Sequence, residues 1–197
     1  RSESTAPTQE LHITAHGTRL SQVPVYKFLG VMLDERLDMA EQAKRVCAKA
    51  RKRLGAIRRL ASARFQPTTA TLRTVYMSFF QPIIEYGIAC YYPWIGAEDR
   101  KAIEDTMTEA AATVLGVPAR GVAKEALYAE ADVPFLTELA GRKAVETYAR
   151  GLAAEEGNPL RECVRVAPVG PDFVGLATLL PGSRAVVKAL AKRAVGR

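Results

Sequence analysis

The segment from residue 38 to 62 carries apolar residues at intervals of three and four, a spacing that predicts one long amphipathic helix. Basic residues occupy the rest of the predicted helix circumference. The apolar stripe consists of Met39, Ala43, Val46, Cys47, Ala50, Leu54, Ile57 and Leu60.

Four further segments up to about residue 155 also have helical periodicity. The first spans residues 68–90, and Pro82 should kink it because proline cannot donate the next hydrogen bond. The others span 97–115, ending at Gly116, then 123–130 and about 134–155. We expect the 38–62 and 68–90 helices to form the core pair. Their expected core residues include Leu54, Ile57, Tyr76, Phe79 and Phe80.

Residues 11–33 are rich in β-branched and aromatic side chains, which predicts two strands joined as a β-hairpin. The strands correspond to LHITAHGTRL and VPVYKFLGVML, with turn signals at Gly17 and at residues 21–24. Gly30, inside the second predicted strand, indicates a bulge or a close approach of another segment.

The predicted elements give a mainly α protein, with a short N-terminal β-hairpin packed on a bundle of four to five helices. The 197-residue chain is 48% hydrophobic and 25% charged, which is typical of a globular domain. We divide it into a flexible N-terminal segment at 1–10, a hairpin at 11–37, a helical bundle at 38–156, and a linker with a basic tail at 157–197.

The net charge of +7 is unevenly distributed along the chain. Between residues 44 and 64 there are nine basic residues and no acidic one, and the tail after residue 184 is also basic without an acid. Residues 98–109 form an acidic stretch between them. The nine are Lys44, Arg45, Lys49, Arg51, Lys52, Arg53, Arg58, Arg59 and Arg64.

Cysteine and hydropathy patterns indicate an intracellular, reducing compartment and no membrane contact. Cys47, Cys90 and Cys163 are widely spaced, which argues against a disulfide framework or a zinc site. Cys47 and Cys90 fall on apolar helical positions, where a free thiol behaves as a small hydrophobe. No apolar run approaches the roughly 18 to 20 residues that cross a bilayer. We expect no cofactor, and the start at Arg1 suggests that upstream sequence is missing.

Four motifs occur in an order that resembles the non-LTR retrotransposon reverse transcriptases. They are YKFLGVMLDERLDM at 26–39, RKRLGAIRRLA at 51–61, LRTVYMSFFQPIIEYGIACYYPW at 72–94 and ATVLGVPA at 112–119. In that family a helix rich in Arg and Lys follows the primer-grip hairpin, and a later helix ends in a Pro-x-x-Glu-Tyr-Gly pattern. Pro82, Glu85, Tyr86 and Gly87 match this pattern, and the similarity covers about residues 11–155.

The resemblance implies a thumb, a helical bundle that holds an RNA or RNA–DNA duplex by its backbone. The primer-grip-like residues would be Tyr26, Lys27, Phe28, Leu29 and Gly30. The nine basic residues of the 44–64 run would bind phosphates, because Lys and Arg on a helix face neutralise a backbone without reading bases. At helical spacing, Arg51, Arg58 and Arg59 should lie near one flank of the apolar stripe. The alternative is a solvated helix face.

The sequence departs from the family in two places. Polymerisation needs paired Asp residues that hold two metal ions, and this chain has no Asp-Asp pair, so we expect no catalysis by the chain alone. An upstream palm could make the full protein an RNA-directed DNA polymerase. The third predicted helix carries acids at 98–109 where the family usually carries basic residues. That helix should therefore face a protein subunit or a basic segment of the same chain.

Three functions fit these observations. The chain can be the thumb of an active retroelement polymerase, whose palm lies upstream. It can instead be a palm-less, domesticated thumb that serves as a structural subunit of a ribonucleoprotein such as a mitochondrial ribosome. A purely protein-binding helical bundle is the third, and it predicts no measurable RNA affinity at about 0.1 M salt. Nucleus, cytoplasm and mitochondrion all fit the sequence.

Overall fold

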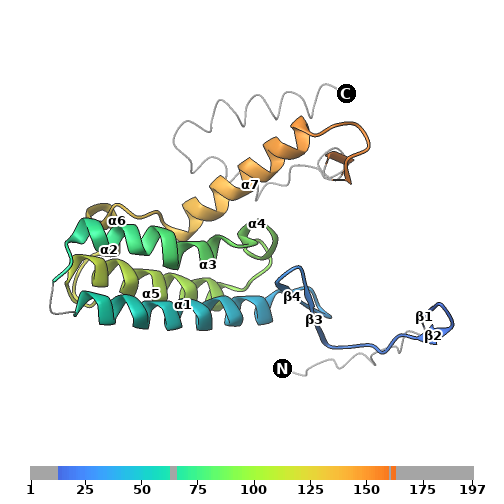
Figure 1. Cartoon of the computed structure of the whole chain (residues 1–197), viewed down its shortest axis with the longest axis horizontal. Coiled ribbons are helices and arrows are strands. Elements are labelled where there is room, and N and C mark those ends of the chain that lie inside the picture. Colours follow the sequence, from blue (N-terminus) through green and yellow to red (C-terminus); the bar gives the residue numbers. More distant parts are fainter. Residues whose placement is uncertain (1–12, 63–65, 160, 163–197) are drawn as a thin grey trace.

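A computed structural model describes residues 13–62, 66–159 and 161–162. This part of the chain is mainly helical, with two small antiparallel hairpins near its N-terminal end (Figure 1). The prediction of an N-terminal β-hairpin on a helical bundle is thereby confirmed. Arg64, the segment at 1–10 and the basic tail after residue 184 lie outside the described residues.

Each of the two predicted strand segments folds back on itself, so the prediction that they pair with one another is wrong. Strand β1 (Thr14–Ala15) pairs with β2 (Thr18–Arg19), and β3 (Val25–Phe28) pairs with β4 (Val31–Asp34). Both loops contain two residues with positive φ, the backbone of a type I′ hairpin turn. In the second loop φ is 44° at Leu29 and 88° at Gly30, so Gly30 lies in a turn and not inside a strand.

The bundle is centred on α1 (Ala40–Ala61), which packs most extensively along α5 (Ala97–Leu115) and not along the 68–90 segment as predicted. The buried residues of α5 include Ala110, Ala111 and Ala112, and such small side chains let helix backbones approach closely. As predicted, α5 stops at Gly116, whose φ is 70°. The 68–90 segment is interrupted, which limits its contact with α1.

The 68–90 segment is divided into α2 (Thr69–Val75), a π-helical turn η1 (Tyr76–Phe80), α3 (Gln81–Glu85) and α4 (Ile88–Tyr91). The Gln81 N–H bonds to the Tyr76 carbonyl across the π turn, directly before Pro82. Gly87, with a φ of 71°, separates α3 from α4. The predicted kink at Pro82 stays a prediction, because the irregular turn is η1, before Pro82, and the helix ends at Glu85 and not near residue 90.

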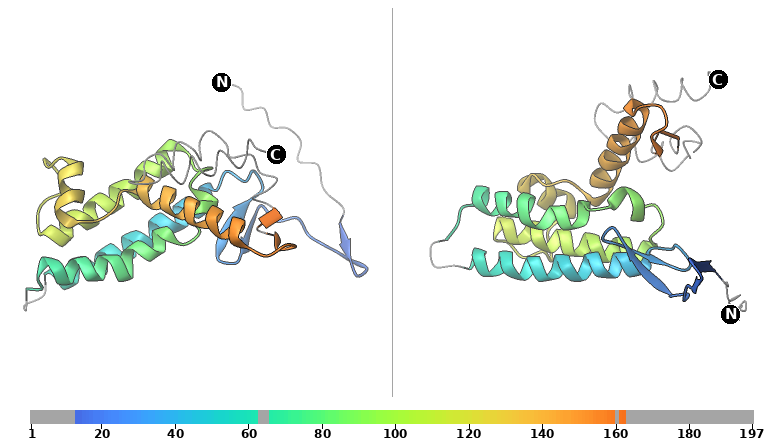
Figure 2. Two further views of the ribbon diagram at one scale, coloured as in Figure 1. Left: turned by 90° about the horizontal axis from the view of Figure 1, so that it is seen from above. Right: turned by 45° about the vertical axis from the view of Figure 1, so that its right-hand side comes forward.

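Two further helices, α6 (Lys124–Ala131) and α7 (Leu136–Ala153), complete the described part of the bundle. Their bounds agree with the predicted helices to within about two residues. Helix α6 packs beside α5, whereas Figures 1 and 2 show that α7 starts against the bundle and then points away from it. Glu85 of α3 forms an ion pair of 3.1 Å with Arg142 of α7, and this contact ties α3 and α7 together.

The buried core contains Leu54, Ile57, Tyr76 and Phe80, as predicted. Phe79 is an exception, because 42% of this residue is exposed. Its ring lies on the outer side of η1, where the Arg53 guanidinium stacks over it at 4.0 Å from the ring centroid. The prediction that Phe79 belongs to the core is therefore wrong.

The two cysteines in the described part differ in exposure. Cys47 is buried between α1 and α5, with its Sγ 3.4 Å from the Ala102 carbonyl oxygen. Cys90 is exposed on α4, which differs from the apolar helical position that the sequence predicted for it. The short helix α4 turns this side chain outward, because Gly87 breaks the helical phase that the sequence suggested.

Candidate nucleic-acid interface

The basic residues of α1 lie on two different flanks of the helix. On one flank, Arg58 forms an ion pair of 2.7 Å with Glu109 of α5. On the other, Arg59 lines a cavity with Ile83 of α3. The prediction that Arg58 and Arg59 share a flank with Arg51 is therefore wrong. Adjacent residues on a helix point about 100° apart, so a charge run that follows the sequence cannot stay on one face.

The α3 side of α1 forms a surface that we call the basic groove. Two adjoining cavities of about 270 and 460 Å³ make up the groove, and both are lined by Lys49 and Ile83. Val46, Ala56 and Pro82 supply further apolar lining, and none of the described residues that line the groove is acidic. Its cations are Arg45, Lys49, Lys52, Arg53 and Arg59.

The groove cations follow the axis of α1 at intervals that keep them on one side of the helix. From Arg45 to Arg59 the helix rises about 21 Å, since each residue adds about 1.5 Å. A single strand of B-form DNA places about six phosphates along that distance, at about 3.4 Å of axial rise each, and an A-form RNA duplex places slightly more because its rise is shorter. Among the described residues, no acid forms an ion pair with Lys49, Lys52 or Arg59. These three cations can therefore meet phosphates without first losing a partner.

The opposite flank of α1 is close to acidic side chains. Arg58 is paired with Glu109, and Lys44 donates a hydrogen bond of 2.7 Å to Glu41. This hydrogen bond, with the charge of Glu41 and a smaller contribution from Asp99 of α5, raises the pKa of Lys44. The α5 flank is therefore partly neutralised within the chain.

The acidic helix α5 contacts basic side chains of the same chain. The sequence predicted either this contact or a contact with a protein subunit. Besides the Glu109 pair with Arg58, Glu104 forms an ion pair of 2.5 Å with Lys124 of α6. These contacts account for two of the acids at 98–109. A protein partner for the remaining acids stays a prediction.

The β3–β4 hairpin docks against the end of α3 through its turn. The Tyr86 hydroxyl donates a hydrogen bond of 2.5 Å to the Leu29 carbonyl, and Gly30 lines the groove. The neighbouring turn residue Leu29 is 77% exposed. Of the five residues predicted as primer-grip-like, only Gly30 lines either cavity of the groove; Tyr26, Lys27, Phe28 and Leu29 are exposed outside both.

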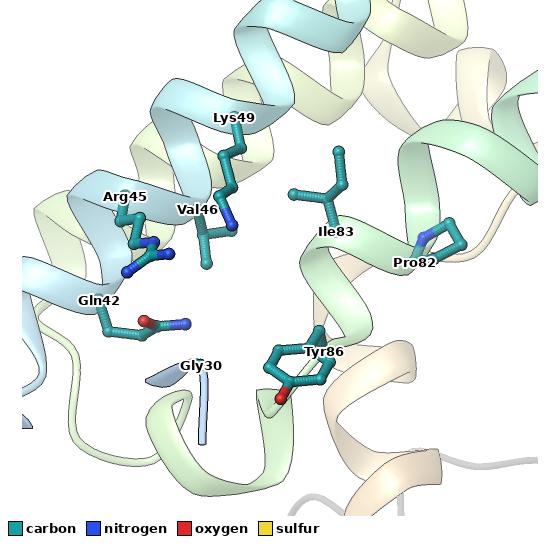
Figure 3. A pocket seen from close by; sticks show the side chains of 8 residues that line it. All are labelled: Gly30, Gln42, Arg45, Val46, Lys49, Pro82, Ile83 and Tyr86. Carbon is teal, nitrogen blue, oxygen red and sulfur yellow. The ribbon is translucent and has the colours of Figure 1, made fainter. Parts of the chain in front are cut away.

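Sequence reasoning missed several side chains that shape the groove. Gln42 is a buried polar residue on α1, and its Oε1 accepts a hydrogen bond of 2.9 Å from the Met32 N–H of β4. A polar residue beside an apolar stripe could have signalled this role. Tyr86 and Ile83 reach the groove from α3, as Figure 3 shows. Their placement depends on which helix packs beside α1, and this cannot be read from periodicity.

Gly30→Ala should destabilise the protein by about 1 to 3 kcal/mol, measured as the free energy of unfolding in urea. An added Cβ would lie 2.9 Å from the Tyr86 hydroxyl oxygen, and a φ of 88° is strained for alanine. Gly121→Ala is the matched control, because its φ is 83° but no described atom lies within 4 Å of the added Cβ. The control should lose only the part of the unfolding free energy that comes from backbone strain, without the part that comes from the contact with Tyr86. Equal losses for both substitutions would contradict the tight docking of the hairpin on Tyr86.

The described residues contain no cluster of three or more His, Cys, Asp or Glu side chains that could hold a metal ion. No helix in the same part of the chain has the length and apolar character needed to cross a membrane. Comparison with protein-family models, curated proteins and solved structures finds no match for this chain. Functional inference therefore rests on the geometry and charge of the basic groove.

Proposed function

We propose that this chain is a non-catalytic nucleic-acid-binding module that grips an RNA or RNA–DNA duplex through its backbone, as the thumb of a non-LTR retroelement reverse transcriptase. The observation that carries the proposal is the row of cations in the basic groove, with no acid among the described residues that line it. Backbone phosphates match such a row because they repeat regularly and need only positive charge.

A helix face that is merely solvated would be expected to intersperse acids with its bases. Arg58 of α1 is neutralised by Glu109 of α5 and Lys44 by Glu41 of α1 itself, whereas none of the described residues that line the groove is acidic. This segregation concentrates positive potential in a concave surface, where low-dielectric walls strengthen the attraction of an anionic chain. This asymmetry favours a surface that binds a polyanionic ligand over a helix face that is merely solvated.

Binding that depends on backbone contacts should weaken steeply with salt and vary little with base sequence. If all five groove cations contact phosphates, the plot of log affinity against log salt should have a slope of about −3.5 to −4.5. Basic residues of the tail can add to this slope. Fluorescence anisotropy with two duplexes of unrelated sequence and equal length would measure both properties. A slope near zero, or affinities that differ more than about tenfold between the duplexes, would contradict the proposal.

A further inference from the structure

The hairpin end of the basic groove is a pocket with its own shape and chemistry, which we call the Tyr86 pocket. It has a volume of about 270 Å³. Figure 3 shows side chains from α1 facing Ile83 and Tyr86 across this space, with the hairpin turn at one end. The lining residues are Gly30, Gln42, Arg45, Val46, Lys49, Pro82, Ile83 and Tyr86.

We propose that the Tyr86 pocket binds one unpaired nucleotide, with the base against the Tyr86 ring and the phosphate held by Lys49 and Arg45. This inference rests on the proposed function of the basic groove, because the pocket continues that groove through Lys49 and Ile83. It goes beyond a backbone grip, since a base enters the pocket as well as a phosphate.

The polar side chains that line the pocket offer hydrogen-bond donors. Lys49 and Arg45 carry only donors. Gln42 uses its carbonyl oxygen to accept the Met32 N–H at 2.9 Å, which leaves its amide nitrogen for the pocket, toward which Figure 3 shows it directed. Tyr86 uses its hydroxyl proton on the Leu29 carbonyl. A ligand must therefore bring acceptors and negative charge, as a phosphate and the carbonyl oxygens of a base do.

The Tyr86 ring is a fixed aromatic wall. The residue is 57% exposed, yet its hydroxyl is bonded to Leu29 at 2.5 Å, and Gly30 leaves the space that the hydroxyl occupies. An exposed ring that is already held in place loses little conformational freedom when a base stacks on it. Stacking of this kind tolerates any base, because every base has a π-face. Ile83, Pro82 and Val46 provide apolar contacts around the same space.

The size of the pocket selects a single nucleotide. Its volume of about 270 Å³ is just below the range of about 300 to 1,000 Å³ that small-molecule pockets occupy, so it leaves no room for a ligand larger than one nucleotide. A paired base inside a duplex is stacked on both faces and cannot present one face to Tyr86. The nucleotide must therefore be unpaired, at a strand end or in a single-stranded stretch. A peptide carboxylate would satisfy the cations but would leave the aromatic wall unused.

The test uses the full chain and uridine 5′-monophosphate, whose base carries two carbonyl acceptors. Titration followed by NMR should show saturable binding, and ribose 5-phosphate and uridine should each bind at least tenfold more weakly. Lys49→Gln and Tyr86→Leu should each weaken binding about tenfold. Arg58→Gln, on the α5 flank, and Trp94→Leu, an exposed aromatic outside the groove, should change it less than twofold.

Tyr86→Phe is the second variant, and it separates a loss of stacking from a folding defect. It keeps the aromatic ring but removes the hydrogen bond from the Tyr86 hydroxyl to the Leu29 carbonyl. It should bind uridine 5′-monophosphate better than Tyr86→Leu does, at comparable melting temperature. Equal binding of ribose 5-phosphate and uridine 5′-monophosphate would overturn the proposal, because it would show an anion site without a base. An unchanged affinity in folded Tyr86→Leu would do the same. The salt dependence of duplex affinity, measured on the same samples, tests separately whether the basic groove binds a nucleic-acid backbone.

Discussion

Replacing Lys49, Lys52 and Arg59 together by Gln should lower the affinity for duplex RNA roughly a hundredfold at about 0.1 M salt. These exposed cations line the basic groove without an acid partner among the described residues. Each lost phosphate contact flattens the slope of log affinity against log salt by about 0.7 to 0.9, so the triple variant should flatten it by about 2 to 3. Gln keeps the helix propensity close to that of Lys and Arg, so α1 should stay folded.

The matched control replaces Lys44, Arg51 and Arg58 by Gln. It removes the same number of charges from the same helix, but from exposed positions outside the groove, where Lys44 and Arg58 already have acidic partners. At 0.1 M salt, charges more than about 10 Å from the nucleic acid are largely screened. The control should therefore lower the affinity less than tenfold and change the slope by less than about one. Equal effects in both variants would show that the groove is not the binding surface.

These two sets of substitutions differ from the set that the sequence alone favours. The sequence points to Arg51, Lys52, Arg58 and Arg59, because helical spacing predicts Arg51, Arg58 and Arg59 near one flank of the apolar stripe and Lys52 farther round, so that at least three can reach one backbone. In the structure Lys52 and Arg59 line the groove, whereas Arg58 faces α5. Periodicity locates a residue on the circumference of its own helix, but not which neighbour covers each flank. The candidate site could therefore be located only from the way in which α3 and α5 pack on α1.

The long helices were the most predictable part of the fold. The apolar periods of 38–62 and 97–115 are sustained over several turns, and Gly116 supplies a left-handed C-terminal residue, so α1 and α5 agree with their predicted bounds to within two residues. The hairpins were harder, because one turn places Leu29 at a φ of 44°, where Asn, Asp or Gly is the usual signal. A bulky apolar residue such as Leu29 in a turn position is therefore easily interpreted as part of a strand.

The segment around η1 shows a second limit of sequence reasoning. Tyr76, Phe79 and Phe80 are neighbours in an aromatic run that suggests a broad apolar face. The π turn adds a residue to one turn of the helix, so the side chains beyond it point in directions that a regular α-helical period does not predict. Phe80 is fully buried, whereas Phe79 is 42% exposed and stacks beneath Arg53. The two residues offer a direct test of this packing.

Phe80→Ala should destabilise the protein by about 3 to 5 kcal/mol, because removing a fully buried ring loses its transfer free energy and leaves a cavity. The ring also packs against Tyr76, with 5.0 Å between their centroids, so this contact is lost as well. Urea unfolding followed by circular dichroism would measure the loss as a shift of the midpoint at constant slope.

Phe79→Ala is the matched control, since it removes the same ring from the adjacent position of the same helical turn. It should cost about 1 kcal/mol, because the residue is 42% exposed in the folded state and its cation–π contact with Arg53 contributes about 0.5 to 1 kcal/mol at an exposed site. A loss for Phe79→Ala as large as that for Phe80→Ala would place both rings in the core. That result would contradict the exposure of Phe79 in the structure, where its ring stacks with Arg53 outside the core. A small loss for both would instead show that the packing of η1 against α1 contributes little to stability.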